Sequence, residues 1–276
     1  MHPEFRRVAR SEGLRHEAVR YGRHSAQVAD VLCRPDAQGR PLVVVIHGGF
    51  WRDLYDRGHT APQCAALAAE GYVVAAIEYR RVGGGGGWPT TFTDLAEGLD
   101  ALPGLVTELD KDLIDPDRVV LMGHSAGGHL ALWAAGRHRL APGAPGYRAD
   151  PPRIRGVVGL AAVANLGWAV AAELGNGAVE DFVGVTPEHD PENRYACADP
   201  ARLLPTGLRT INVHGGLDED VPLDCAAAYV AAAIEAGDPA ELRVLEWEEH
   251  FAVISPGSRA WPTVLAATAD LLRDPA

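Results

Sequence analysis

Short apolar runs alternate along the chain with segments whose apolar residues recur at helical spacing. The apolar runs are rich in β-branched residues, which suits strands buried on both faces. They are Leu42–Ile46, Tyr72–Ile77, Val119–Met122, Val157–Leu160, Thr210–Val213 and Leu242–Leu245. The helical segments between them are Gln63–Glu70, Asp94–Leu102, His129–His138 and Asp224–Ala236. Strands that alternate with helices predict an α/β fold with a mostly parallel central sheet and helices on both faces.

The alternation stops between Asn165 and Pro205, where short helical pieces are interrupted by Pro and Gly. In parallel α/β proteins, ligands bind outside the carboxyl ends of the strands. We therefore expect residues 165–205, approximately, to form a lid or cap insertion over that edge, within a single domain that spans residues 1–276. The alternative is that this segment is a long structural loop directed away from that edge of the sheet.

Composition narrows the classes of partner. The chain has 37 acidic and 25 basic residues and a formal charge of −12, which disfavours nucleic acid and anionic membranes as partners. No run is long and apolar enough to span a bilayer, and the charged N-terminus lacks a signal core. The four cysteines form no CxxC pair, so we expect reduced thiols and no zinc site. The expectation is a cytoplasmic protein that acts on a small molecule; its oligomeric state is not readable from the sequence.

A serine stands between two glycines where an apolar run gives way to a helical segment, in the stretch VVLMGHSAGGHLALWAA. Gly-x-Ser-x-Gly between a strand and a helix is typical of a nucleophile elbow. Gly123 and Gly127 permit the sharp backbone turn that presents the hydroxyl of Ser125. We predict that Ser125 is a nucleophile, against the alternative of a simple tight turn.

A serine nucleophile needs a base and a carboxylate that orients it, in the chain order Ser, Asp or Glu, His. Among the later histidines, His250 follows the sixth apolar run and is the predicted base. Asp218 is the first carboxylate after the fifth run and the predicted acid, with Glu219 and Asp220 as rivals.

The oxyanion that forms on the substrate needs hydrogen-bond donors. We expect them from the amide of Ala126, directly after the nucleophile, and from Gly48 and Gly49, which follow the first apolar run. His47 in the same loop is predicted to brace the loop rather than to act as the base.

These motifs resemble those of the α/β-hydrolase superfamily over nearly the whole chain. They are His-Gly-Gly-Phe-Trp at 47–51, Gly-His-Ser-Ala-Gly-Gly at 123–128, Asp-Glu-Asp-Val-Pro at 218–222 and Glu-His-Phe at 249–251. The branch that they resemble includes hormone-sensitive-lipase-type esterases, dipeptidyl-peptidase-like hydrolases and kynurenine formamidases; His-Gly-Gly-x-Trp is closest to the formamidase form. The resemblance implies a serine hydrolase that cleaves a small carboxylic ester, or a related amide, through an acyl-enzyme, with no metal and no organic cofactor.

Several alternatives stay open on this sequence. An arylformamidase, or an acyl or lactone transferase or cyclase, would use the same triad; a peptidase and a binding protein without chemistry fit less well. The aromatic residues Phe50, Trp51 and Trp88 are candidates for the substrate pocket, with packing under the loops as the other interpretation. No Arg or Lys lies in the catalytic motifs, which predicts a neutral acyl group of modest size.

Overall fold

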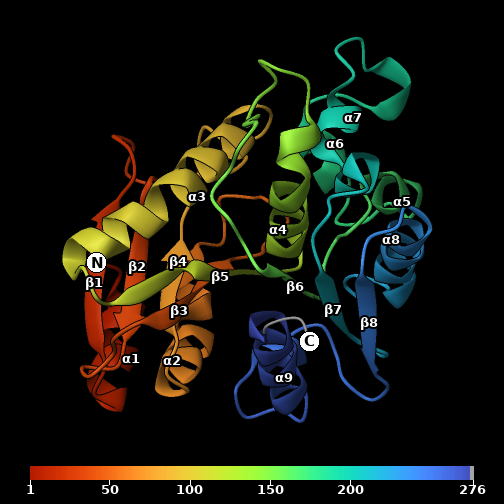
Figure 1. Ribbon diagram of the computed structural model, residues 1–276. Coiled ribbons are helices and arrows are strands. Elements are labelled where there is room, and N and C mark those ends of the chain that lie inside the picture. The colour runs from red at the N-terminus through yellow and green to blue at the C-terminus, as the bar shows by residue number, and fades with distance from the viewer. Residues whose placement is uncertain (274–276) are drawn as a thin grey trace.

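A single eight-stranded sheet runs through the computed structural model, which describes residues 1–273 (Figure 1). Its strand order is β1-β2-β4-β3-β5-β6-β7-β8. The strands are β1 (Arg15–Arg20), β2 (Val28–Cys33), β3 (Arg40–Ile46), β4 (Val73–Ile77), β5 (Ile114–His124), β6 (Gly156–Leu160), β7 (Thr210–Gly215) and β8 (Ala240–Leu245). β2 is antiparallel to both of its neighbours, and the strands from β4 to β8 are parallel. The predicted α/β-hydrolase architecture is confirmed.

Helices cover the two faces of the sheet (Figure 1). α1 (Pro3–Glu12), α2 (Ala61–Ala69) and α9 (Trp261–Leu272) pack on one face, and α3 (Thr90–Leu109), α4 (Ala126–Gly136) and α8 (Leu223–Glu235) on the other. β3 shows why the apolar runs are continuous: Val43 and Val45 belong to the core of the first face, and Val44 to the core of the second. Both faces of the strand are therefore buried in apolar side chains.

All six predicted strands and all four predicted helices are present, but the N-terminal part of the sheet was not predicted. β1 reads RHEAVR and is a half-exposed edge strand, so its sequence carries little apolar signal. β2 is fully buried although Asp30 stands in its middle. Asp30 is paired with Arg57 at 2.6 Å and with His16 at 2.6 Å. A buried charge that is paired in this way breaks the apolar pattern without breaking the strand.

The segment 165–205 contains three short helices, α5 (Leu166–Ala171), α6 (Ala178–Val183) and α7 (Arg194–Ala198). It contacts the loop that follows β3. Phe182 of α6 stacks on Trp51 with ring centroids 4.6 Å apart, and Arg52 donates a hydrogen bond to the carbonyl of Gly175 at 2.9 Å. This loop carries two of the predicted oxyanion donors, so the segment supports it from outside.

All four cysteines are free thiols. Within residues 1–273, no helix combines the length and the apolar character that crossing a bilayer requires.

Candidate active site

Ser125 lies at the sharp turn between β5 and α4. Its backbone has φ 55° and ψ −120°, a region that non-glycine residues rarely adopt. The flanking glycines make the turn possible. A Cβ atom on Gly123 would lie 2.1 Å from the carbonyl oxygen of Gly127, and one on Gly127 would lie 2.1 Å from the carbonyl oxygen of Ile46. The Gly-x-Ser-x-Gly pattern is thus a steric requirement of the strand–helix junction.

The strained turn is held by hydrogen bonds from the neighbouring strand end. The Ser125 amide donates to the carbonyl of Leu160 at 2.9 Å, and the amide of Val163 donates to the carbonyl of Ser125 at 3.2 Å. Both partners belong to β6 or the residues just after it. The position of the serine is therefore fixed by the sheet before any substrate arrives.

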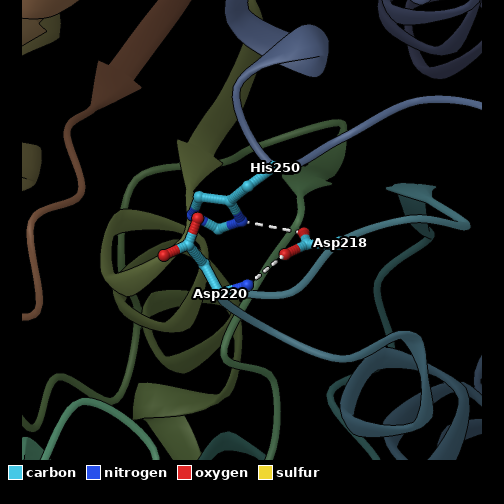
Figure 2. Close-up of side chains that lie close together, drawn as sticks. All are labelled: Asp218, Asp220 and His250. Atoms are coloured by element: carbon cyan, nitrogen blue, oxygen red, sulfur yellow. Dashed lines mark hydrogen bonds and ion pairs between the residues drawn. The ribbon is translucent and has the colours of Figure 1, made fainter.

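His250 and Asp218 meet across the loops that follow β8 and β7. The Nδ1 atom of His250 lies 2.8 Å from Oδ2 of Asp218, as Figure 2 shows. The two loops touch through their backbones, since the amide of Leu217 donates to the carbonyl of Glu248 at 3.1 Å. A Cβ atom on Gly215 would lie 2.2 Å from the same carbonyl oxygen. The close approach that places the acid beside the base therefore depends on this glycine.

The carboxylate of Asp218 is held in its charged form. Burial opposes ionisation, but hydrogen bonds from His214 and His250 outweigh it and lower the pKa of the carboxyl below its ordinary value. The Oδ1 atom accepts the backbone amides of Asp220 at 3.0 Å and Val221 at 2.8 Å. A fixed anion beside Nδ1 keeps the proton on that nitrogen and leaves Nε2 free to act as a base.

His214 is a second histidine on the same carboxylate. Its Nε2 atom lies 3.3 Å from Oδ2 of Asp218 and 2.8 Å from the carbonyl oxygen of Val221, while its Nδ1 atom is buried without a partner. His214 also follows Ser125 in the sequence. The structure places it behind Asp218, where it fixes the acid.

His124 links the nucleophile to the base loop. Its ring lies 4.6 Å from the ring of His250, centroid to centroid, and its Nε2 atom donates to the carbonyl of His250 at 3.1 Å. Burial lowers the pKa of His124 well below its ordinary value, so it is neutral. Ser125 and His250 line the same cavity. Among residues 1–273, the hydrogen bonds of the His250 ring and carbonyl go to Asp218 and His124, and none goes to the Ser125 hydroxyl.

The predicted oxyanion donors lie around the nucleophile. A Cβ atom on Gly48 would lie 2.7 Å from the carbonyl oxygen of His124 and 3.0 Å from Cβ of Ser125, so the loop after β3 passes directly beside the serine. Gly49 has φ 109° and lines the cavity. Ala126 is the first residue of α4, where backbone amides have no partner inside the helix and the helix dipole favours an anion.

His47 braces this loop, as expected from its position. It is fully buried, with Nδ1 2.8 Å from the carbonyl oxygen of Gly48 and Nε2 2.8 Å from Oε1 of Glu78. Its ring stacks on Tyr79 at 4.4 Å, and the Tyr79 hydroxyl donates to the His47 carbonyl at 2.7 Å. These contacts fix the backbone just before Gly48 and leave His47 away from the serine.

A cavity of about 440 Å³ opens onto Ser125 and His250. Its wall carries residues from the β3 loop, the nucleophile turn and the C-terminal loops. They are Gly49, Phe50, Tyr55, His59, Pro62, His124, Ser125, Asp220, His250, Phe251, Ile254, Ser255, Pro256 and Gly257. Of the aromatic candidates, Phe50 is on this wall. Trp51 is fully buried against Phe182, and Trp88 packs edge-on against Phe92, so neither is among the described residues that line the cavity.

Asp218, Asp220 and His250 are also close enough to be considered as metal ligands. One polar atom from each lies within 4.8 Å of the others, the one such cluster found in residues 1–273. The hydrogen bond between His250 and Asp218 already occupies both groups, and it is the bond that an acid–base histidine needs (Figure 2). We therefore treat His250 and Asp218 as a hydrogen-bonded pair and consider Asp220 separately.

The fold and the serine turn define the class: this is an α/β-hydrolase. A family model narrows the assignment, because residues 30–231 match the family described as BD-FAE. The chain belongs to the BD-FAE family. The match includes Ser125, Asp218 and the loop after β3, and ends before His250.

Curated relatives and solved structures agree with this assignment. The chain is 28% identical over 228 residues to esterase LipC of Mycobacterium tuberculosis, covering 77% of this chain and 53% of LipC. It is 31% identical over 141 residues to the probable carboxylic ester hydrolase LipM of the same organism, covering 50% of this chain and 31% of LipM. The chain thus spans about half the length, or less, of these relatives. Esterase LipW of Mycobacterium marinum has the same fold, with a TM-score of 0.77 at 18% identity over 98% of this chain and 86% of LipW.

Sequence reasoning missed much of the cavity wall. Tyr55, His59 and residues 254–257 lie outside any motif and reach the serine only through the fold. Asp220 was considered only as a rival for the triad acid, and the structure instead puts it on the wall. Its place two residues after the acid was the available signal, because a short turn brings both side chains near the base.

Proposed function

We propose that this chain is a carboxylic ester hydrolase that works through a Ser125–His250–Asp218 triad and an acyl-enzyme. One observation carries the proposal: a strained serine at the end of β5 shares a cavity with a histidine whose Nδ1 atom lies 2.8 Å from a buried, ionised aspartate. The esterase names of LipC and LipM support the reaction class.

In the proposed mechanism, Nε2 of His250 takes the proton of Ser125 as the hydroxyl oxygen attacks the ester carbonyl. Asp218 stabilises the imidazolium that forms. The amides of Gly48, Gly49 and Ala126 donate to the oxyanion. His250 then protonates the leaving alkoxide, and water, deprotonated by the same histidine, hydrolyses the acyl-enzyme.

The cavity favours an ester of modest size. About 440 Å³ accommodates a small ester, and the wall carries aromatic and aliphatic side chains beside the polar groups of the site. An arylformamidase or an acyl transferase would use the same catalytic residues, and substrate comparison separates them. We also propose that residues 165–205 cap the site, because Gly175 of this segment lies against the ring of Phe50 on the cavity wall.

Hydrolysis by the wild type and by Ser125→Ala tests the proposal. We expect the wild type to hydrolyse p-nitrophenyl acetate and butyrate faster than the octanoate, because the cavity is small. Ser125→Ala should lose about 10³-fold or more of this activity. N-formylkynurenine serves as the amide comparison. If the wild type hydrolyses N-formylkynurenine faster than every ester, the protein is a formamidase and not an esterase. Equal activity of the wild type and Ser125→Ala would refute the serine mechanism.

A further inference from the structure

The cavity at Ser125 carries one acidic side chain that the mechanism does not use. Asp220 is exposed and lines the cavity together with Ser125 and His250. Figure 2 shows its carboxylate beside the ring of His250, and one of its oxygens lies within 4.8 Å of a ring nitrogen. The backbone amide of Asp220 donates to Asp218 at 3.0 Å, which anchors the residue to the triad.

In the part of the chain that the structure describes, the carboxylate of Asp220 has no cationic partner. None of the ion pairs among residues 1–273 includes it, and no Lys or Arg is among the described residues that line the cavity. The histidines of the wall other than His250 do not compensate it. His124 is buried, which lowers its pKa well below the ordinary value, and the exposed His59 also has a lowered pKa because its ring is partly desolvated, so both are neutral. The cavity therefore carries a negative potential at neutral pH.

Aromatic rings stand on the same wall. Phe251 follows the catalytic histidine and is 59% exposed, and Tyr55 is 51% exposed. Phe50 also lines the cavity. Aromatic faces together with a carboxylate are the groups that bind ammonium ions in proteins.

We propose that the site prefers esters whose alcohol part carries a positive charge, held by Asp220 and the aromatic rings. The placement of the charge follows from the mechanism. Asp220 lies beside His250, and His250 gives its proton to the leaving oxygen, so the carboxylate faces the alcohol side of the ester rather than the acyl side. The inference rests on the proposed esterase function and adds a substrate class to it.

Three acetyl thioesters with leaving groups of similar size test the inference. Acetylthiocholine carries a positive charge, S-(3,3-dimethylbutyl) thioacetate is its uncharged isostere, and 2-(acetylthio)ethanesulfonate carries a negative charge. Thiol release measures kcat/KM for each. For the wild type we expect the cationic ester to exceed the neutral one by about tenfold, and the neutral one to exceed the anionic one by a similar factor.

Asp220→Asn keeps the backbone and the side-chain shape but removes the charge. We expect its cation-to-neutral ratio to fall several-fold, to the preference that the aromatic rings give alone. Glu219→Gln is the matched control, since it removes the same charge from the adjacent exposed residue, which does not line the cavity. Its ratio should stay at the wild-type value.

The outcomes separate the inference from the function on which it rests. Equal kcat/KM for all three thioesters, with p-nitrophenyl acetate hydrolysed through Ser125, would overturn the inference and leave the esterase intact. The inference would also be overturned if Asp220→Asn lowered kcat/KM by the same factor for all three thioesters, because that pattern indicates a structural role. If no ester is hydrolysed in a way that depends on Ser125, both the proposed esterase function and this inference are wrong.

Discussion

At the scale of single residues, the site depends on which atom of each group carries a proton. Asp218 accepts two backbone amides at Oδ1 and two histidines at Oδ2, so four donors converge on one buried carboxylate. This arrangement explains why the carboxyl stays ionised despite its burial. The charge favours the tautomer of His250 that carries its proton on Nδ1, and this is the tautomer that the proposed mechanism requires.

Replacing Asp218 by Asn tests this arrangement. The amide oxygen can still accept the backbone donors, but the amide NH₂ group would face Nδ1 of His250 and favour the wrong tautomer. We expect kcat to fall about 10⁴-fold with little change in KM. Ester hydrolysis at saturating substrate measures the effect, and Glu219→Gln should retain wild-type activity. A loss of less than tenfold in Asp218→Asn would mean that another group orients the histidine.

At the scale of elements, the junction of β3, β5 and α4 leaves no room for side chains. A Cβ atom on Gly127 would lie 2.1 Å from the carbonyl oxygen of Ile46 and 2.5 Å from that of His47. Both of these atoms belong to backbone, which yields less readily than the end of a flexible side chain. The start of α4 is therefore pressed against the end of β3, and this contact sets the distance between the nucleophile and the oxyanion loop.

We expect Gly127→Ala to destabilise the protein by about 1–3 kcal/mol, because relief of the overlap must shift backbone. The variant should also lose activity through displacement of Ser125. Gly104→Ala is the matched control: Gly104 lies in α3, and a Cβ atom there meets nothing within 4 Å. It should stabilise the protein by about 0.5–1 kcal/mol. Urea unfolding of both variants measures the difference; equal free energies of unfolding would contradict the steric account.

The sequence predicted the elements that follow simple rules. The continuous β-branched runs predicted the central strands, and Gly-His-Ser-Ala-Gly predicted the turn. Both could be predicted because burial and steric limits there depend on residues that are close together in the sequence. β2 could not be predicted because Asp30 is compensated by Arg57, a residue distant in the sequence. The role of His214 was equally hidden, since only the fold brings its ring to Asp218. The cavity wall is formed by residues from four separate loops, and no local sequence pattern predicts which loops come together.

At the scale of the whole molecule, several histidines are buried in neutral form. His129 is an example: its Nδ1 atom accepts the indole N–H of Trp51 at 3.2 Å, and its Nε2 atom donates to the carbonyl of Ala198 at 2.9 Å. Burial lowers the pKa of His129 to about 4 and that of His124 well below its ordinary value. The unfolded chain binds protons at these groups near pH 6.5, and the folded chain does not.

The protein should therefore lose stability as the pH falls below about 6.5, since the unfolded state binds more protons. The stabilising contribution is complete above that pH and disappears as the pH approaches 4. Each such histidine contributes a slope of up to about 1.4 kcal/mol per pH unit. Urea unfolding between pH 7.5 and 4.5 measures how the free energy of unfolding depends on pH. In His129→Gln the slope should be smaller by the contribution of one histidine, because unfolding of the variant takes up about one proton fewer. An unchanged slope in this variant would show that His129 is charged in the folded protein.

The most direct test of the account is the identity of the atom that a fluorophosphonate probe modifies. Because the elbow, the base and the oxyanion donors together activate one hydroxyl, we expect one adduct per chain, located on the peptide that contains Ser125. The adduct should be absent from folded Ser125→Ala and should form about 10³-fold or more slowly in His250→Ala. Modification of another residue, or no modification of the folded wild type, would contradict the assignment of Ser125 as the nucleophile.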